Sequence, residues 1–135
     1  MKIGSIILVI ISTFILMTGC TNVADEIVGT WEYQTFDTQP SGTILCTFDD
    51  SGNMVRMATY GDSLYIDSCE YIIDNSILKK KMTITGSVKF FGLPPLDGLY
   101  RIDKFKDDIL IMTRFRLPND EKAGAYLRVE MIRKN

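Results

Sequence analysis

The feature that most constrains the fold is a series of short β-prone segments with turn signals between them. β-branched and aromatic residues recur in runs of roughly six to ten, and clusters containing Gly, Asn, Asp or Pro separate them. No amphipathic helical stretch is long enough to connect parallel strands, so we expect an antiparallel sheet. The alternation predicts eight strands, over residues 29–36, 43–48, 54–60, 64–73, 77–85, 99–105, 109–116 and 125–133.

Eight short strands with short connections predict an all-β fold, an antiparallel up-and-down eight-stranded barrel. Such a barrel removes exposed sheet edges by closing on itself. A two-sheet β-sandwich is the alternative. The connections carry residues that suit tight turns, among them Gly61-Asp62-Ser63 and Lys106-Asp107-Asp108.

The first 20 residues follow a different pattern. Residues 3–17 are almost wholly apolar and fall short of the roughly 20 residues that span a bilayer, which is typical of a signal peptide. The run ends at Met17-Thr18-Gly19-Cys20, which resembles the lipobox of bacterial lipoproteins, with Met17 where Leu is usual. The resemblance implies cleavage before Cys20 and attachment of acyl chains such as palmitate to it. The alternatives are an ordinary signal peptide with a chance Cys and an uncleaved membrane anchor.

These patterns divide the chain into three parts. We expect a lipoprotein signal peptide over residues 1–19, a lipidated tether over residues 20–26 and one β-barrel domain over residues 27–135. Several acyl chains on Cys20 would anchor the protein stably in a membrane. Thr21 follows Cys20 where Asp could stand, which resembles lipoproteins sorted to the outer membrane. We therefore expect a cell-envelope protein in the outer membrane, on either its periplasmic or its surface face.

Charge and residue usage exclude several classes of function. Without residues 1–19, which hold Lys2, the chain has 14 basic and 17 acidic residues and a net charge of −3. A mildly acidic protein is not expected to bind nucleic acid. The chain has no His, which excludes His-based triads and the usual zinc sites, and it has no phosphate-binding glycine motif. We therefore expect no enzymatic activity, no cofactor and no metal.

One motif points to a family. The segment Ile27-Val28-Gly29-Thr30-Trp31-Glu32-Tyr33 resembles the start of a lipocalin-like (calycin-type) barrel, in which a helical turn precedes Gly-x-Trp on the first strand. Residues 47–52 and 71–78 are similar to hairpins of bacterial lipocalin-like lipoproteins of undetermined function. The resemblance covers most of residues 27–133, as a strand rhythm with one short motif.

The resemblance also implies how one end of the barrel closes. In that family the Trp after Gly29 lies beneath a basic side chain of the last strand, which assigns this role to Trp31. Arg133 is the better partner than Arg128, because it shares its face of the strand with Leu127, Val129 and Met131. The other interpretation makes Trp31 a core aromatic only.

Alternation further predicts which polar side chains face the barrel interior. A buried charge is costly unless it is paired, so such residues often mark a ligand site or a buried pair. The hypothesis is that a Lys and tyrosine hydroxyls bind the acidic head of an amphipathic ligand, and the candidates are Tyr33, Tyr65, Asp67, Tyr71 and Lys80. The alternative is that Lys79-Lys80-Lys81 is a solvated run, because a shift of one residue in register turns Lys80 and Asp67 outward.

Two further features stay open. Cys46 and Cys69 could form a disulfide outside the cytoplasm, but an intervening strand would separate them, so two buried free thiols are the other interpretation. The apolar loop over residues 90–96 contains Pro94 and Pro95. It either lies at the barrel mouth as a ligand portal or partner contact, or folds back and completes the core.

Two functions fit these patterns. The first is a membrane-anchored barrel that binds a small apolar or amphipathic ligand at the cell envelope, and the second is an interaction or structural module with a filled barrel. An eight-stranded barrel can be filled by side chains or can hold one ligand. An interior cavity of roughly 300 Å³ or more would favour the first.

Overall fold

The computed structural model describes residues 22–34, 43–76, 79–88, 95–119 and 121–135, without the side chains of residues 123–126. The expected signal peptide and Cys20 lie outside the described residues. Within the described part of the chain, no helix is both long and apolar enough to cross a membrane.

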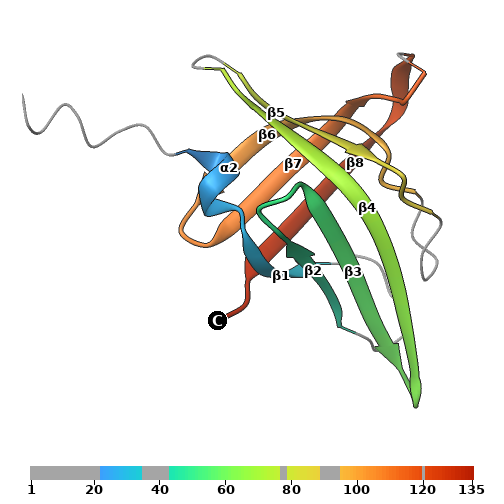
Figure 1. Cartoon of the computed structure of the whole chain (residues 1–135). Coiled ribbons are helices and arrows are strands. Elements are labelled where there is room, and N and C mark those ends of the chain that lie inside the picture. Colours follow the sequence, from blue (N-terminus) through green and yellow to red (C-terminus); the bar gives the residue numbers. More distant parts are fainter. Residues whose placement is uncertain (1–21, 35–42, 77–78, 89–94, 120) are drawn as a thin grey trace, which may run out of the picture.

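Eight antiparallel strands pair in chain order, and β1 also pairs with β8, so the sheet closes into a barrel (Figure 1). The prediction of an all-β, up-and-down, eight-stranded barrel is confirmed, and the two-sheet sandwich is excluded. The strands are β1 (Gly29–Gln34), β2 (Ile44–Phe48), β3 (Asn53–Tyr60), β4 (Ser63–Asn75), β5 (Lys80–Thr85), β6 (Gly98–Lys106), β7 (Ile109–Arg116) and β8 (Lys122–Arg133).

A short helix, α2 (Val23–Glu26), precedes the first strand. The Asn22 side chain caps it by accepting a hydrogen bond from the backbone N–H of Ala24. Val23 and Ile27 are fully buried against the barrel. Val23 lies within residues 20–26, the expected tether, so the last part of that stretch packs on the barrel.

The connections of an up-and-down barrel alternate between its two ends. One end, called here the α2 end, holds α2 and the turns that follow β2, β4 and β6. The opposite end, called here the mouth, holds the connections that follow β1, β3, β5 and β7. The β3–β4 hairpin projects beyond the other strands at the mouth (Figure 1).

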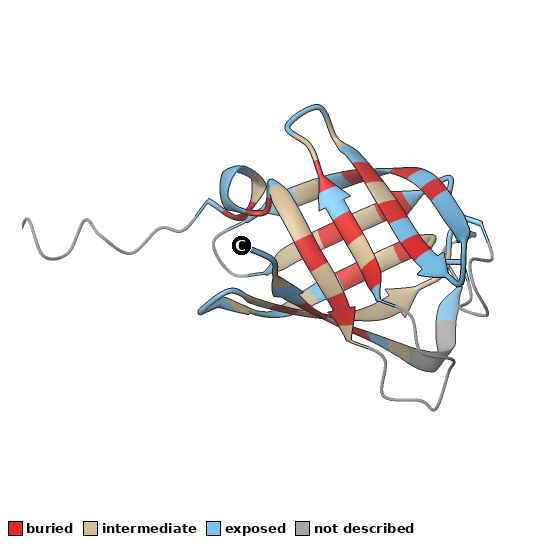
Figure 2. Cartoon of the chain, turned by 90° about the horizontal axis from the view of Figure 1, so that it is seen from below, coloured by how far each residue is buried: buried red, intermediate tan, exposed pale blue. Residues whose placement is uncertain are grey.

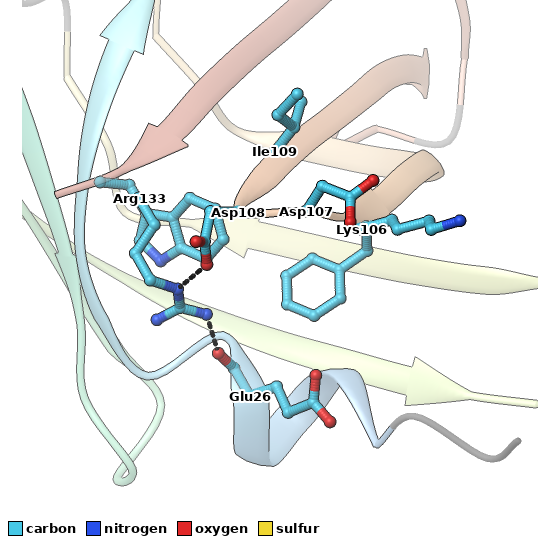
Figure 3. A pocket seen from close by; sticks show the side chains of 8 residues that line it. Glu26, Lys106, Asp107, Asp108, Ile109 and Arg133 are labelled. Carbon is cyan, nitrogen blue, oxygen red and sulfur yellow. Dashed lines mark hydrogen bonds and ion pairs between the residues drawn. The ribbon is translucent and has the colours of Figure 1, made fainter. Parts of the chain in front are cut away.

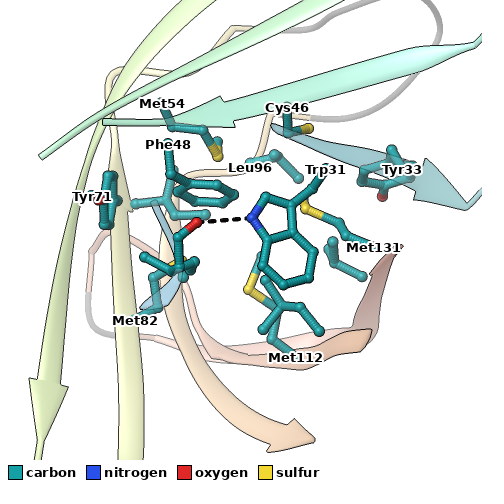
Figure 4. Packing of buried hydrophobic residues seen from close by; sticks show 14 of the residues in the cluster. Trp31, Tyr33, Cys46, Phe48, Met54, Tyr71, Met82, Leu96, Met112 and Met131 are labelled. Carbon is teal, nitrogen blue, oxygen red and sulfur yellow. Dashed lines mark hydrogen bonds between the residues drawn. The ribbon is translucent and has the colours of Figure 1, made fainter. Parts of the chain in front are cut away.

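Buried and exposed residues alternate along the strands, as a sheet with one face toward a core requires (Figure 2). Four fully buried methionines lie in the core with the Trp31 indole (Figure 4). Methionine adapts to irregular gaps, which suits an interior that tapers around one large ring. The four are Met54, Met82, Met112 and Met131.

Candidate functional site

Trp31 closes the α2 end of the barrel. The residue is 1% exposed, and its indole N–H donates a hydrogen bond of 2.8 Å to the carbonyl of Ile27. The Arg133 guanidinium lies 4.3 Å from the centre of the ring. A cation–π contact of this kind contributes on the order of 0.5–2 kcal/mol. This placement agrees with the alternation along the last strand.

Arg133 also links three segments at this end (Figure 3). It donates hydrogen bonds to the carbonyls of Glu26 and Val28 and forms an ion pair of 3.1 Å with Asp108. Gly29 has φ +136°, and a Cβ there would lie 3.0 Å from an Arg133 nitrogen. Gly29, Trp31 and Arg133 therefore form one structural unit. The pocket beside it measures about 190 Å³ and is lined by Glu26, Trp31, Phe105, Lys106, Asp107, Asp108, Ile109 and Arg133.

A buried ion pair lies inside the barrel. Arg56 is 0% exposed, and its Nε and Nη2 donate hydrogen bonds of 2.9 and 2.6 Å to one carboxylate oxygen of Asp67. Nη2 also donates to the carbonyl of Val88 at 2.9 Å. Asp67 therefore does face inward, but Arg56 on the neighbouring strand neutralises its charge.

The two thiols lie near this pair, and they are free and buried rather than bridged. Cys46 is opposite Arg56 in register and Cys69 is opposite Met54, so β3 lies between the two cysteines. Burial raises the pKa of each thiol to about 12. Both therefore stay protonated and unreactive at neutral pH.

Leu96, which precedes β6 at the mouth, is fully buried in the core. Its N–H donates to the Ser87 hydroxyl at 2.6 Å, and its carbonyl accepts from the Tyr100 hydroxyl at 2.6 Å. The carboxylate of Asp97 accepts a bond of 2.7 Å from the N–H of Ser87. Arg114 donates to the carbonyls on both sides of Leu96. The described end of the connection thus completes the core, whereas residues 90–94 lie outside the described residues.

The five candidate ligand residues do not form one site. Tyr33 and Asp67 lie inside the barrel, and the Tyr71 hydroxyl donates to the carbonyl of Asp49 at the α2 end. Tyr65 is 45% exposed on the β3–β4 hairpin, whereas Lys80 is half-buried and lies opposite Asn75 at the α2 end. The two positions are roughly 30 Å apart along β4, too far for one small ligand to contact both.

A second pocket, of about 210 Å³, lies on the barrel wall toward the mouth. It is lined by Thr83, Ile84, Thr85, Gly98, Leu99, Arg116, Leu117 and Pro118. Neither this pocket nor the one beside Trp31 is a cavity enclosed by the interior faces of all the strands. Both are also smaller than the volume expected for a ligand-binding interior, roughly 300 Å³.

The outer face of the β3–β4 hairpin carries an apolar patch, the hairpin patch, made of Met57, Leu64 and Ile66. Met57 and Ile66 are direct partners across the two strands. Their exposed fractions are 37%, 56% and 59% respectively. Sequence alternation did not single out this patch, because it assigns residues to faces without showing which faces lack a covering layer.

Arg56 was also missed by sequence reasoning. It alternates with Met54 and Ala58, both buried, so the same alternation that placed Asp67 inside would have placed Arg56 there too. Two opposite charges predicted on interior faces of adjacent strands are the available signal for a buried pair.

No protein-family model matches this chain, and no curated protein matches it. The functional inference therefore rests on the geometry of the described residues.

Proposed function

We propose that this protein is a lipid-anchored, lipocalin-like barrel of the cell envelope that acts through its outer surface, as a protein-interaction module. It acts by binding a partner rather than by catalysis. The packing of the described residues supports this proposal, because their buried side chains occupy space in which a lipocalin-like protein would hold a ligand. The buried pair of Arg56 and Asp67 is the central part of that filling.

Two of the polar side chains inside the barrel are held by bonds within the barrel. Asp67 is bound by Arg56, and the Tyr100 hydroxyl is bound to the carbonyl of Leu96. A ligand would have to displace these bonds and the Leu96 side chain before it gained any contact. Removing a partner from a buried polar group costs about 1–3 kcal/mol for each bond, so a preformed interior site is not favoured.

The anchor is proposed to be the lipid on Cys20, in the outer membrane. Since Val23 is already packed on the barrel, only two residues separate it from Cys20. A tether this short would hold the α2 end against the bilayer and direct the mouth away from it. Replacing Cys20 tests this: Cys20→Ser is expected to abolish incorporation of labelled palmitate, and incorporation into the variant would contradict the proposal.

The filled barrel is tested by thermal unfolding of the mature, lipidated protein in mild detergent, with fatty acids, haem and sterols added in turn. We expect no shift in Tm and no stoichiometric ligand in an organic extract. Leu96→Ala is the positive control, because the space it opens should bind a small apolar compound such as benzene and raise Tm. A ligand that raises the Tm of the unaltered protein would favour the ligand-binding function instead.

A further inference from the structure

We propose that the edge of β4 over residues 63–69 binds an extended segment of a partner protein by strand addition. This inference rests on the proposed function and specifies it, since it assigns the surface of the module and the form of its partner. In strand addition, an extended segment hydrogen-bonds to an exposed sheet edge and its alternate side chains contact the neighbouring face.

The edge arises because β4 is longer than the neighbour on one of its sides. β3 pairs with β4 over residues 63–70, whereas β5 pairs with it only over residues 70–75. Among the described residues, no strand pairs with the β5 side of β4 over residues 63–69. Within the described part of the chain, the β5 side of β4 is therefore an edge over these residues, on the hairpin that projects at the mouth (Figure 1).

The hairpin register fixes which backbone groups point outward. Tyr60 and Ser63 flank the two-residue turn Gly61-Asp62, in which Gly61 has φ +58°. In such a turn the flanking residues exchange both backbone hydrogen bonds, and every second residue after them does the same. Residues 63, 65 and 67 therefore direct their N–H and C=O groups toward β3. Leu64, Ile66 and Ser68 direct theirs to the opposite edge, where an added strand would pair.

The side chains at this edge suit a partner and lack the usual protection. Leu64 and Ile66 are more than half exposed, and Met57 extends their apolar surface onto β3. Natural edge strands are commonly blocked by Lys, Pro, bulges or inward-pointing charges. Residues 63–66 contain neither Lys nor Pro, and the charge that follows, Asp67, is already neutralised by Arg56.

Charge and geometry favour a different protein over a second copy of this chain. Antiparallel pairing of two β4 edges centred on Ile66 would bring Asp62 of the copy to Glu70, where β5 already pairs through Thr85, and both acids are exposed. It would also point the two α2 ends in opposite directions, which conflicts with two anchors in one membrane. The complementary segment is therefore apolar at alternate positions, with basic residues near its ends to face Asp62 and Glu70.

The probe for the test is the blocked peptide Lys-Val-Thr-Val-Thr-Val-Lys, added to the mature, lipidated protein in detergent micelles. Amide hydrogen exchange is followed residue by residue by NMR. In the free protein we expect the amides of Leu64, Ile66 and Ser68 to exchange faster than those of Tyr65 and Asp67. Saturating peptide is expected to slow the first three about tenfold or more and to leave the other two unchanged.

Two N-methylated versions of the peptide separate strand addition from simple apolar contact. In the expected pairing, valines lie on the same face as Leu64 and Ile66, so the valine N–H groups point to β4. Methylation of the three valine nitrogens is expected to abolish binding, whereas methylation of the two threonine nitrogens preserves it. Equal binding of both versions would overturn the proposal.

Two variants on one strand and one face provide a matched control. Ile66→Lys is expected to weaken peptide binding by about tenfold or more, through repulsion of the basic peptide and loss of apolar contact. Ile72→Lys is expected to leave it unchanged, because β5 covers the edge at Ile72 although its side chain is 71% exposed. Unchanged thermal unfolding of both variants shows that each remains folded.

Three other results would overturn the inference. Slow exchange at Leu64, Ile66 and Ser68 in the free protein would show that the chain covers its own edge. Concentration-dependent dimers with the same three amides protected would make a second copy the occupant. Failure of the peptide to bind at millimolar concentration would remove strand addition. None of these results changes the ligand test of the filled barrel, so the failure of one proposal is distinguishable from failure of the other.

Discussion

The barrel interior and the β3–β4 hairpin belong to the same sheet but differ in which side chains are buried and which are exposed. Inside, even charged groups are buried, because each finds a partner: Arg56 binds Asp67 and the carbonyl of Val88. On the hairpin, apolar side chains such as Leu64 and Ile66 stay in solvent, because they point to the outer face of the sheet, which no described segment covers. The contrast indicates that the interior maintains the fold and the hairpin is available for binding.

The largest effect should come from breaking the buried ion pair. Asp67→Leu leaves the Arg56 charge buried without its carboxylate, and we expect a loss of about 3–5 kcal/mol in the free energy of unfolding. The double variant Arg56→Met with Asp67→Leu should recover most of this loss, since both charges are then gone. Urea unfolding at pH 7 measures both. A loss below about 1 kcal/mol in the single variant would show that water reaches the pair.

The next largest effect concerns the side chain that completes the core at the mouth. Leu96→Ala removes a fully buried side chain, and we expect a loss of about 2–5 kcal/mol. Ile72→Ala is the control, since it removes a similar side chain from the outer face and should change stability by no more than about 0.5 kcal/mol. Equal effects of the two substitutions in urea unfolding would contradict a filled barrel.

The pH dependence of stability tests whether the Cys46 thiol is buried in the interior. Burial raises the pKa of Cys46 from 9.0 to about 12 in the folded protein. The unfolded chain therefore releases this proton first, so the thiol's contribution is fully present below pH 9.0 and is lost as pH rises toward 12. The expected loss is about 1.4 kcal/mol for each pH unit in that range. Cys46→Ala should reduce the slope of stability against pH, and an unchanged slope would show that the thiol is solvated.

Much of the fold was predictable from the sequence because local chemistry determines it. Runs such as Tyr71-Ile72-Ile73 favour strands, and Gly61-Asp62 favours a two-residue turn, whatever surrounds them. The alternation also placed Asp67 on an interior face, with an outward register as the alternative. It favoured Arg133 over Arg128 as the basic side chain that the family resemblance places over Trp31. The burial of Val23, which lies in the expected tether, was not predictable because it depends on the barrel end against which the side chain packs.

The candidate ligand site was not predictable in the same way. Tyr65 and Asp67 share one face of β4, yet one is exposed and the other is buried. Alternation gives the face of a residue, whereas burial depends on how far the neighbouring strands extend. Those lengths depend on pairing between segments distant in sequence, and so does the entry of Leu96 into the core. The same pairing between distant segments determines which part of β4 is an edge.

The smallest effect on stability is expected at the hairpin, where a substitution should lower peptide affinity without changing the free energy of unfolding. Ile66→Thr keeps a β-branched side chain in the strand and removes apolar surface that the fold does not bury, so the free energy of unfolding should change by no more than about 0.5 kcal/mol. Affinity for the valine–threonine peptide should nevertheless fall, by roughly fivefold to thirtyfold, since burying that apolar surface is worth about 1–2 kcal/mol. Urea unfolding and peptide titration on one preparation measure both quantities. A large loss of stability with unchanged affinity would assign Ile66 to the fold and remove the distinction between hairpin and interior.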